Sequence, residues 1–114
     1  MAAALACLRE LANRRAIERM DEIGMALRRG LDAQANDHDV EIRQSGPPAI
    51  PFLTFVADRG KFARSRRFAA ECARGGIYFH PHHNWFLSAA HGTADVRATL
   101  EVTDRAFSQV KRDF

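Results

Sequence analysis

Histidines are concentrated in one short stretch of this sequence, which holds His80, His82, His83 and His91. In an extended segment, side chains two residues apart project to the same side, so His80 and His82 could present two ring nitrogens together. With His91 or Cys72, they could complete the tetrahedral ligand set that zinc prefers. The spacing matches no established zinc pattern, however, and a polar loop at the edge of a cleft is the alternative interpretation.

Other catalytic chemistries find little support in the residue pattern. Ser88 lacks the Gly-x-Ser-x-Gly context of a hydrolase nucleophile. Cys72 lies on the apolar face of a predicted helix, where a buried structural thiol is favoured over a reactive one. Gly75-Gly76 follows a predicted helix, whereas a phosphate-binding loop must precede one. Residue types and spacing therefore predict no catalytic, cofactor-binding or metal-binding residue.

The charged residues limit the chemistry further. The chain has 17 Lys and Arg against 14 Asp and Glu, a formal net charge of +3, and its only lysines are Lys61 and Lys111. Few candidates therefore exist for any reaction that needs a lysine amine. The densest basic run, Arg64-Ser-Arg-Arg67, is short and lies on a helix that also needs a solvated face. A small metal- or nucleic-acid-binding module that uses the His-rich loop and Arg64–Arg67 is thus the alternative function.

The composition is that of an ordinary globular protein, with 46% hydrophobic and 27% charged residues. No apolar run approaches the roughly 20 residues of a membrane span, so no membrane association is expected. Met1–Leu8 has no cationic region before its apolar residues, which argues against a signal peptide. Cys7 and Cys72 do not form a disulfide framework, and we expect reduced thiols in a cytoplasmic protein.

A continuous apolar stripe predicts helix over residues 1–33, as one long helix or as a pair broken at Asn13. The stripe consists of Leu5, Leu8, Ala12, Ala16, Met20, Ile23, Leu27 and Leu31. Two strands, Val40–Arg43 and Phe52–Val56, are predicted within residues 40–56 from their alternating or β-branched and aromatic residues. The segment Ser45-Gly-Pro-Pro48 between them cannot pair regularly, because proline donates no ladder hydrogen bond.

The second half of the chain repeats this mixture of helix and strand. Helical spacing predicts a helix over 61–74, and Gly75-Gly76 ends it. Within residues 77–88, strands at Ile77–Phe79 and Trp85–Ser88 flank the His-rich loop, and a last helix covers 94–111. The order predicts one α+β domain, with a small antiparallel or mixed sheet of three to four strands covered by helices.

Four segments resemble a known family in their order and spacing. They are Met1-Ala-Ala-Ala-Leu-Ala-Cys-Leu-Arg-Glu-Leu11, Ser45-Gly-Pro-Pro48 followed by Phe52-Leu-Thr-Phe55, Arg74-Gly-Gly-Ile-Tyr-Phe-His-Pro81, and Phe86-Leu-Ser-Ala-Ala-His-Gly-Thr-Ala-Asp95. Together they resemble the C-terminal domain of class III pyridoxal-phosphate (PLP) aminotransferases. The nearest branch is similar to glutamate-1-semialdehyde aminomutase. The resemblance covers essentially the whole chain.

The resemblance implies the C-terminal domain, or a fragment, of an aspartate aminotransferase-like PLP enzyme. The parent would transfer amino groups of an amino acid or amino ketone as a homodimer, without nucleic acid or membrane partners. The family's Schiff-base lysine lies upstream of the first helix, so this chain alone should bind no PLP covalently and be inactive. The loop between the last strands faces the substrate entrance in the family, which makes His82, His83 and Asn84 the substrate-proximal candidates. Its shorter His-His-Asn-Trp sequence departs from the aminomutase pattern and leaves aminotransferase and aminomutase both open.

Overall fold

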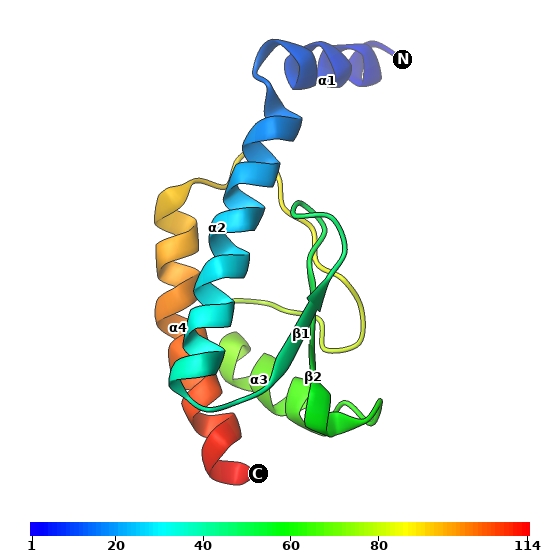
Figure 1. The fold of residues 1–114 in the computed structure, drawn as a ribbon. Helices are drawn as coiled ribbons and strands as arrows, with labels where there is room; N and C mark the ends of the chain where they lie inside the picture. The colour runs from blue at the N-terminus through cyan, green and yellow to red at the C-terminus, as the bar shows by residue number, and fades with distance from the viewer.

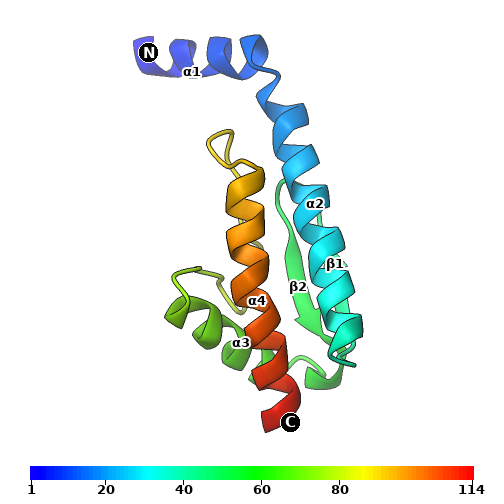
Figure 2. The ribbon, with the colours of Figure 1, turned by 90° about the vertical axis from the view of Figure 1, so that its left-hand side faces the viewer.

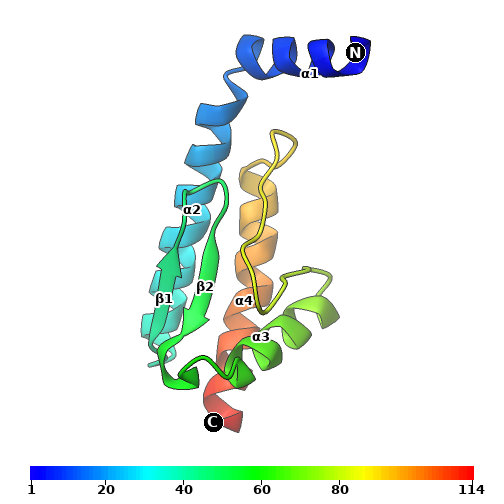
Figure 3. The same cartoon turned by 90° about the vertical axis from the view of Figure 1, so that its right-hand side faces the viewer.

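Helices make up most of the chain in the computed structural model, which describes all 114 residues (Figure 1). The elements are α1 (Ala2–Asn13), α2 (Ala16–Asp37), β1 (Ile42–Ser45), β2 (Phe52–Phe55), the 3₁₀ helix η1 (Val56–Asp58), α3 (Ala63–Arg74) and α4 (Thr93–Asp113). The α+β class predicted from the sequence is therefore confirmed. α2 and α4 lie side by side, and the sheet, α3 and the segment 76–91 cover this pair (Figure 3).

The N-terminal helical region is a pair of helices set at a sharp angle. The chain turns at Arg14 and Arg15, and Arg15 adopts the left-handed backbone conformation with φ of 48°. Figure 2 shows α1 projecting from the end of α2, away from the rest of the molecule. α2 buries Ile23, Leu27 and Leu31 from the apolar stripe, whereas α1 buries no residue at all.

Aromatic side chains from three elements form the centre of the core. Phe68 of α3 lies 4.8 Å from Phe107 of α4 and 5.6 Å from Phe55 of β2, measured between ring centroids. Edge and tilted arrangements at such distances stabilise aromatic pairs beyond the area that they bury. Leu27 and Leu31 of α2 belong to the same buried cluster. The core thus ties α2, α3, α4 and the sheet together and leaves α1 outside.

The sheet is smaller than the sequence predicts. β1 and β2 pair antiparallel, from Ile42 opposite Phe55 to Ser45 opposite Phe52, and they form the whole sheet. The prediction of three to four strands is therefore wrong. The expected first strand also starts later, because the Val40 N–H donates to the Ala35 carbonyl (2.8 Å) and completes the turn after α2.

Backbone chemistry explains why the other two predicted strands do not form. In the segment Trp85–Ser88, the N–H groups of Trp85 and Leu87 donate to the carbonyls of Pro51 (2.8 Å) and Ala49 (3.0 Å). Pro51 has no N–H to return a bond, so the pairing stays one-sided. In the segment Ile77–Phe79, the Ile77 N–H instead bonds the Cys72 carbonyl (2.9 Å) at the end of α3.

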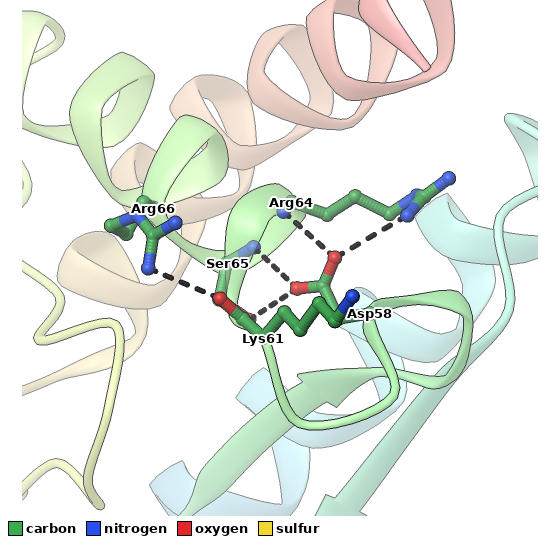
Figure 4. A network of polar contacts seen from close by, with 5 residues as sticks. All are labelled: Asp58, Lys61, Arg64, Ser65 and Arg66. Carbon is green, nitrogen blue, oxygen red and sulfur yellow. Dashed lines mark hydrogen bonds and ion pairs between the residues drawn. The ribbon is translucent and has the colours of Figure 1, made fainter.

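A buried carboxylate organises the start of α3 (Figure 4). Asp58 Oδ1 accepts the backbone N–H of Arg64 (2.9 Å), and Oδ2 accepts the N–H (3.1 Å) and the hydroxyl (3.3 Å) of Ser65. The Arg64 guanidinium lies 3.4 Å from the same carboxylate. Phe62, at the helix cap, has no polar side chain, so Asp58 provides the hydrogen-bond acceptors that free helix N–H groups need.

Candidate functional site

The largest hollow of the molecule is a cleft between α2, α4 and the segment 76–91. Its volume is about 440 Å³, within the range of roughly 300–1,000 Å³ that small-molecule sites occupy. Ile23 and Leu27 of α2 line it from one side, and Val96 and Thr99 of α4 line it from another. Neither a lysine nor an arginine lines this cleft. It therefore suits an apolar or uncharged group better than a carboxylate or a phosphate.

Three histidines form a compact group at one edge of the cleft. The ring of His80 stacks on that of His83, with 3.7 Å between centroids, and meets the edge of His82 at 5.7 Å. His80 Nδ1 accepts the backbone N–H of His82 (3.2 Å), which places its proton on Nε2 when the ring is neutral. Burial, and then the nearby charges of His83 and His82, lower the pKa of His80.

The metal hypothesis finds no support in this arrangement. No group of three or more His, Cys, Asp or Glu side chains lies close enough together to hold a metal ion. His80 and His83 meet face to face, so their ring nitrogens do not converge on a common point. The expected pairing of His80 with His82 assumed a continuous extended strand, whereas the chain bends at Pro81.

The cleft brings together two of the three predicted substrate-proximal residues. His83 and Asn84 line it, and the His83 Nδ1 donates to the Asn84 carbonyl (2.7 Å). His82 does not line it, and its ring instead packs 5.0 Å from that of Phe62, before α3. His91 also lines the cleft from the loop before α4.

Trp85 is a residue of this site that the sequence reasoning did not single out. Its indole stacks on Phe79 with 3.9 Å between ring centroids, and its Nε1–H donates to the His80 carbonyl (2.9 Å). It therefore fixes the backbone on both sides of the His-rich loop. The one tryptophan of the chain, placed inside a polar loop, was the available signal, because a buried indole needs a hydrogen-bond partner.

Neither Ser88 nor Cys72 is arranged for nucleophilic attack. His91 Nδ1 accepts the backbone N–H of Ser88 (3.0 Å) and lies 3.5 Å from its hydroxyl oxygen, so its free lone pair holds a turn rather than activating the serine. Cys72 is fully buried, and burial, followed by the charge of Glu71, raises the pKa of its thiol to about 12. At neutral pH this thiol is protonated and unreactive. Cys7 is exposed on α1.

The lysines and the basic run lie away from the cleft. Lys111 Nζ donates to the carboxylate (2.7 Å) and the carbonyl (3.0 Å) of Asp39, and Lys61 lies before α3. Arg64 contacts Asp58, and Arg67 pairs with acidic residues of α3 and α4. With no cation beside the cleft, these 114 residues do not fit PLP, which needs a Schiff-base amine and a phosphate partner. Because Arg64 and Arg67 are engaged in these ion pairs, the basic run suits a structural role better than nucleic-acid binding.

The helices show no candidate for a membrane span: none combines sufficient length with sufficient apolar character to cross a bilayer.

The chain is similar along its full length to part of a longer protein that is named as an aminotransferase. Over 114 residues it is 49% identical to a protein named aminopentol aminotransferase from Sphingopyxis macrogoltabida, and the match covers 100% of this chain and 27% of that protein. No family model matches the chain.

Solved structures agree with this similarity. The FumI protein of Sphingopyxis sp. MTA144, solved as the PLP internal aldimine, superposes with a TM-score of 0.95 at 48% identity, over 100% of this chain and 27% of that one. An omega-transaminase from Sphaerobacter thermophilus superposes with a TM-score of 0.69 at 19% identity, over 83% of this chain and 24% of that one. The second match shows the fold alone. The chain thus spans about a quarter of the length of the relatives that it matches, which are an aminotransferase and a transaminase by name and a protein solved as its PLP internal aldimine.

Proposed function

We propose that these 114 residues are the C-terminal domain of a class III PLP-dependent aminotransferase. The observation that carries the proposal is the 48% identity and TM-score of 0.95, over the whole chain, with a protein solved as its PLP internal aldimine. This match shows that the fold of the whole chain is shared with that protein. The resemblance of the quoted motifs to class III enzymes supports the class.

The chain contributes one side of a substrate pocket rather than the cofactor site. Since no lysine or arginine lines the cleft, the amine that holds PLP and the groups that bind its phosphate come from a part of the enzyme outside these residues. When bound, PLP supplies the electron sink for amino-group transfer. The domain alone is inactive in this proposal, and the working enzyme is a homodimer.

The substrate is an amine whose carbon skeleton contacts the apolar wall of the cleft. The relative from Sphingopyxis macrogoltabida is named for aminopentol, and we propose an amine of this kind as the donor. A cleft without lysine or arginine offers no counter-ion to a carboxylate, which makes an amino acid the less favoured donor. The His-His-Asn-Trp loop also favours an aminotransferase over an aminomutase.

A chimera tests the proposal directly. The matched quarter of the Sphingopyxis aminopentol aminotransferase is replaced by this chain, and PLP absorbance and amino transfer from aminopentol to a keto acid are measured. We expect a PLP-loaded, active dimer. The control is the 114-residue chain with PLP and borohydride, which should yield no reduced lysine adduct. A folded, dimeric chimera without transfer activity, or an adduct at Lys61 or Lys111, contradicts the proposal.

Variants of the same chimera test the substrate-proximal residues. His83→Ala and Asn84→Ala should raise the KM for the amine, because both side chains line the cleft. His82→Ala is the matched control from the same loop, and it should change KM less because its ring packs on Phe62. Equal effects of all three variants would mean that the loop acts through its conformation and not through contact with substrate.

A further inference from the structure

The stacked imidazoles of His80 and His83, called here the histidine stack, have no acidic partner. Their ring centroids are 3.7 Å apart, and neither ring forms an ion pair. The contrast within the chain is His38, whose Nε2 lies 2.8 Å from Asp104. His82 adds a third imidazole beside the stack. A proton on His38 meets a negative charge, whereas protons on both rings of the stack would meet only each other.

On the cleft side, no protein side chain pairs with a doubly protonated stack. Asp95 is the one carboxylate that lines the cleft, and its Oδ2 accepts the Gly92 N–H (2.8 Å) at the start of α4. His91 contributes another imidazole, and Tyr78 a phenol. α2 contributes only apolar side chains to this cleft. Neither Asp95 nor His91 forms a hydrogen bond or an ion pair with the stack.

On the α3 side, no carboxylate pairs with the stack. Ser65 and Phe68 line a small space beside His80. The charged groups before and at the start of this helix include Lys61 and Arg66, whose guanidinium donates to the Lys61 carbonyl (3.1 Å) (Figure 4). Of the acids on this side, Asp58 is occupied by the N-terminus of α3, and Glu71 of α3 pairs with Arg67 and Arg74. A second positive charge on the stack therefore gains no counter-ion from this side either.

The stack is connected to the wall of the cleft through one side chain. The Trp85 indole donates to the His80 carbonyl (2.9 Å) and stacks on Phe79, while the Trp85 N–H holds the Pro51 carbonyl (2.8 Å). The segment 76–91 is bonded to residues 49–51, before β2, only through the N–H groups of Trp85 and Leu87. A displacement of His80 therefore moves Trp85 and with it the cleft wall.

We propose that the histidine stack is an acid-sensitive latch on the cleft. At neutral pH the two rings stack, and the Trp85 indole stays hydrogen-bonded to the His80 carbonyl. In acid, a second proton forces the rings apart, the Trp85–His80 hydrogen bond breaks, and the segment 76–91 moves away from α4 and opens the cleft.

The direction in which the pKa of His80 is shifted agrees with opening in acid. Burial and the neighbouring histidines hold the pKa of His80 below its ordinary value in the closed state. The open state therefore binds protons more tightly than the closed state does, and protonation favours opening. The closed state is stable at neutral pH and is lost as the pH falls below about 6.5, the ordinary pKa of histidine.

Trp85, as the one tryptophan, reports the latch in the intact chain. Its emission maximum and its quenching by acrylamide are measured between about pH 8 and 5, across the range in which histidine titrates. We expect a reversible red shift and stronger quenching in acid, while the far-ultraviolet circular dichroism stays constant. In His83→Gln, and independently in His80→Gln, this shift should be lost, because one ring can no longer be charged.

Two control variants separate the latch from other titrations. His91→Gln removes a histidine of the same cleft outside the stack, and His38→Gln removes the one paired with Asp104. Both should keep the wild-type shift. The proposal is overturned if the shift survives in both stack variants, if no shift occurs in wild type, or if helix content falls with the same midpoint. None of these outcomes depends on aminotransferase activity.

Discussion

The apolar stripe of the N-terminal region runs through two helices, yet only one of them is buried. Leu27 and Leu31 of α2 are 4% and 0% exposed, whereas Leu5 and Leu8 of α1 are 50% and 64% exposed. The two helices have the same pattern and differ in their surroundings. Helical periodicity thus identifies an apolar face, but it does not identify what covers that face.

Polar contacts reinforce the difference between the two helices. Gln34 of α2 donates to the Leu100 carbonyl (2.7 Å) and accepts the Thr103 hydroxyl (2.6 Å), and so joins α2 to α4 on their facing sides. α1 has only an exposed ion pair, between Glu10 and Arg14, one turn apart. Such pairs contribute little, and a helix of this length is marginal by itself in water.

The largest expected effect comes from the same truncation in the two helices. Leu31→Ala should lower the free energy of unfolding by about 2–5 kcal/mol, because it removes a fully buried side chain and leaves a cavity. Leu8→Ala should change it by about 0.5 kcal/mol or less, as at most exposed positions. Urea unfolding followed by circular dichroism measures both values. Equal losses of unfolding free energy in the two variants would mean that α1 is covered in solution and does not differ from α2 in burial.

Features of the fold that depend on local residue pattern could be predicted from the sequence. Features that depend on hydrogen bonds between backbone groups distant in the sequence could not. The α+β class followed from residue spacing and turn residues. The strand predicted at Trp85–Ser88 does not form because Pro51 cannot return the hydrogen bond that Trp85 donates, and the one at Ile77–Phe79 does not form because the Ile77 N–H bonds the Cys72 carbonyl. In the site, His82, His83 and Asn84 were predicted from family resemblance, and His83 and Asn84 line the cleft. The stacking of His80 on His83 depends on the bend at Pro81. Alternation along a straight strand had paired His80 with His82 instead.

The next effect concerns how closely α2 approaches its neighbours. A Cβ on Gly24 would overlap the Pro48 carbonyl, which is backbone and cannot turn aside. Gly24→Ala should therefore destabilise the chain by about 1–3 kcal/mol, in spite of the higher helix propensity of alanine. Gly30→Ala, on the same helix, meets only the flexible side chain of Leu100 and should cost less. Thermal unfolding of the two variants would show whether close packing, and not helix propensity, distinguishes α2.

Helix starts provide a third, smaller comparison. α1 has no side-chain cap, whereas α3 has the buried Asp58 and α4 has the exposed Asp95. Asp58→Ala should cost about 0.5–2 kcal/mol, toward the upper end because two backbone N–H groups and the Ser65 hydroxyl lose their acceptor. Asp95→Ala removes a single exposed acceptor and should cost less. Both can be measured by urea unfolding at neutral pH, and a larger loss for Asp95→Ala would contradict the importance of burial.

The smallest effect is expected at the exposed ion pair between Asp39, after α2, and Lys111 of α4. The hydrogen bond and the charge of Lys111 lower the pKa of Asp39 below its ordinary value of 3.8. A carboxyl with a lowered pKa in the folded state stabilises that state above the ordinary value, and this stabilisation is lost as the pH falls through the lowered pKa. Lys111→Met should therefore lower the Tm slightly at pH 7, and the difference from wild type should shrink below about pH 4.

Arg14→Met removes the comparable exposed pair on α1 and, because α1 is outside the core, should leave the Tm unchanged at both pH values. A Tm loss in Arg14→Met as large as that in Lys111→Met would show that α1 unfolds together with the core, which its exposed apolar face argues against.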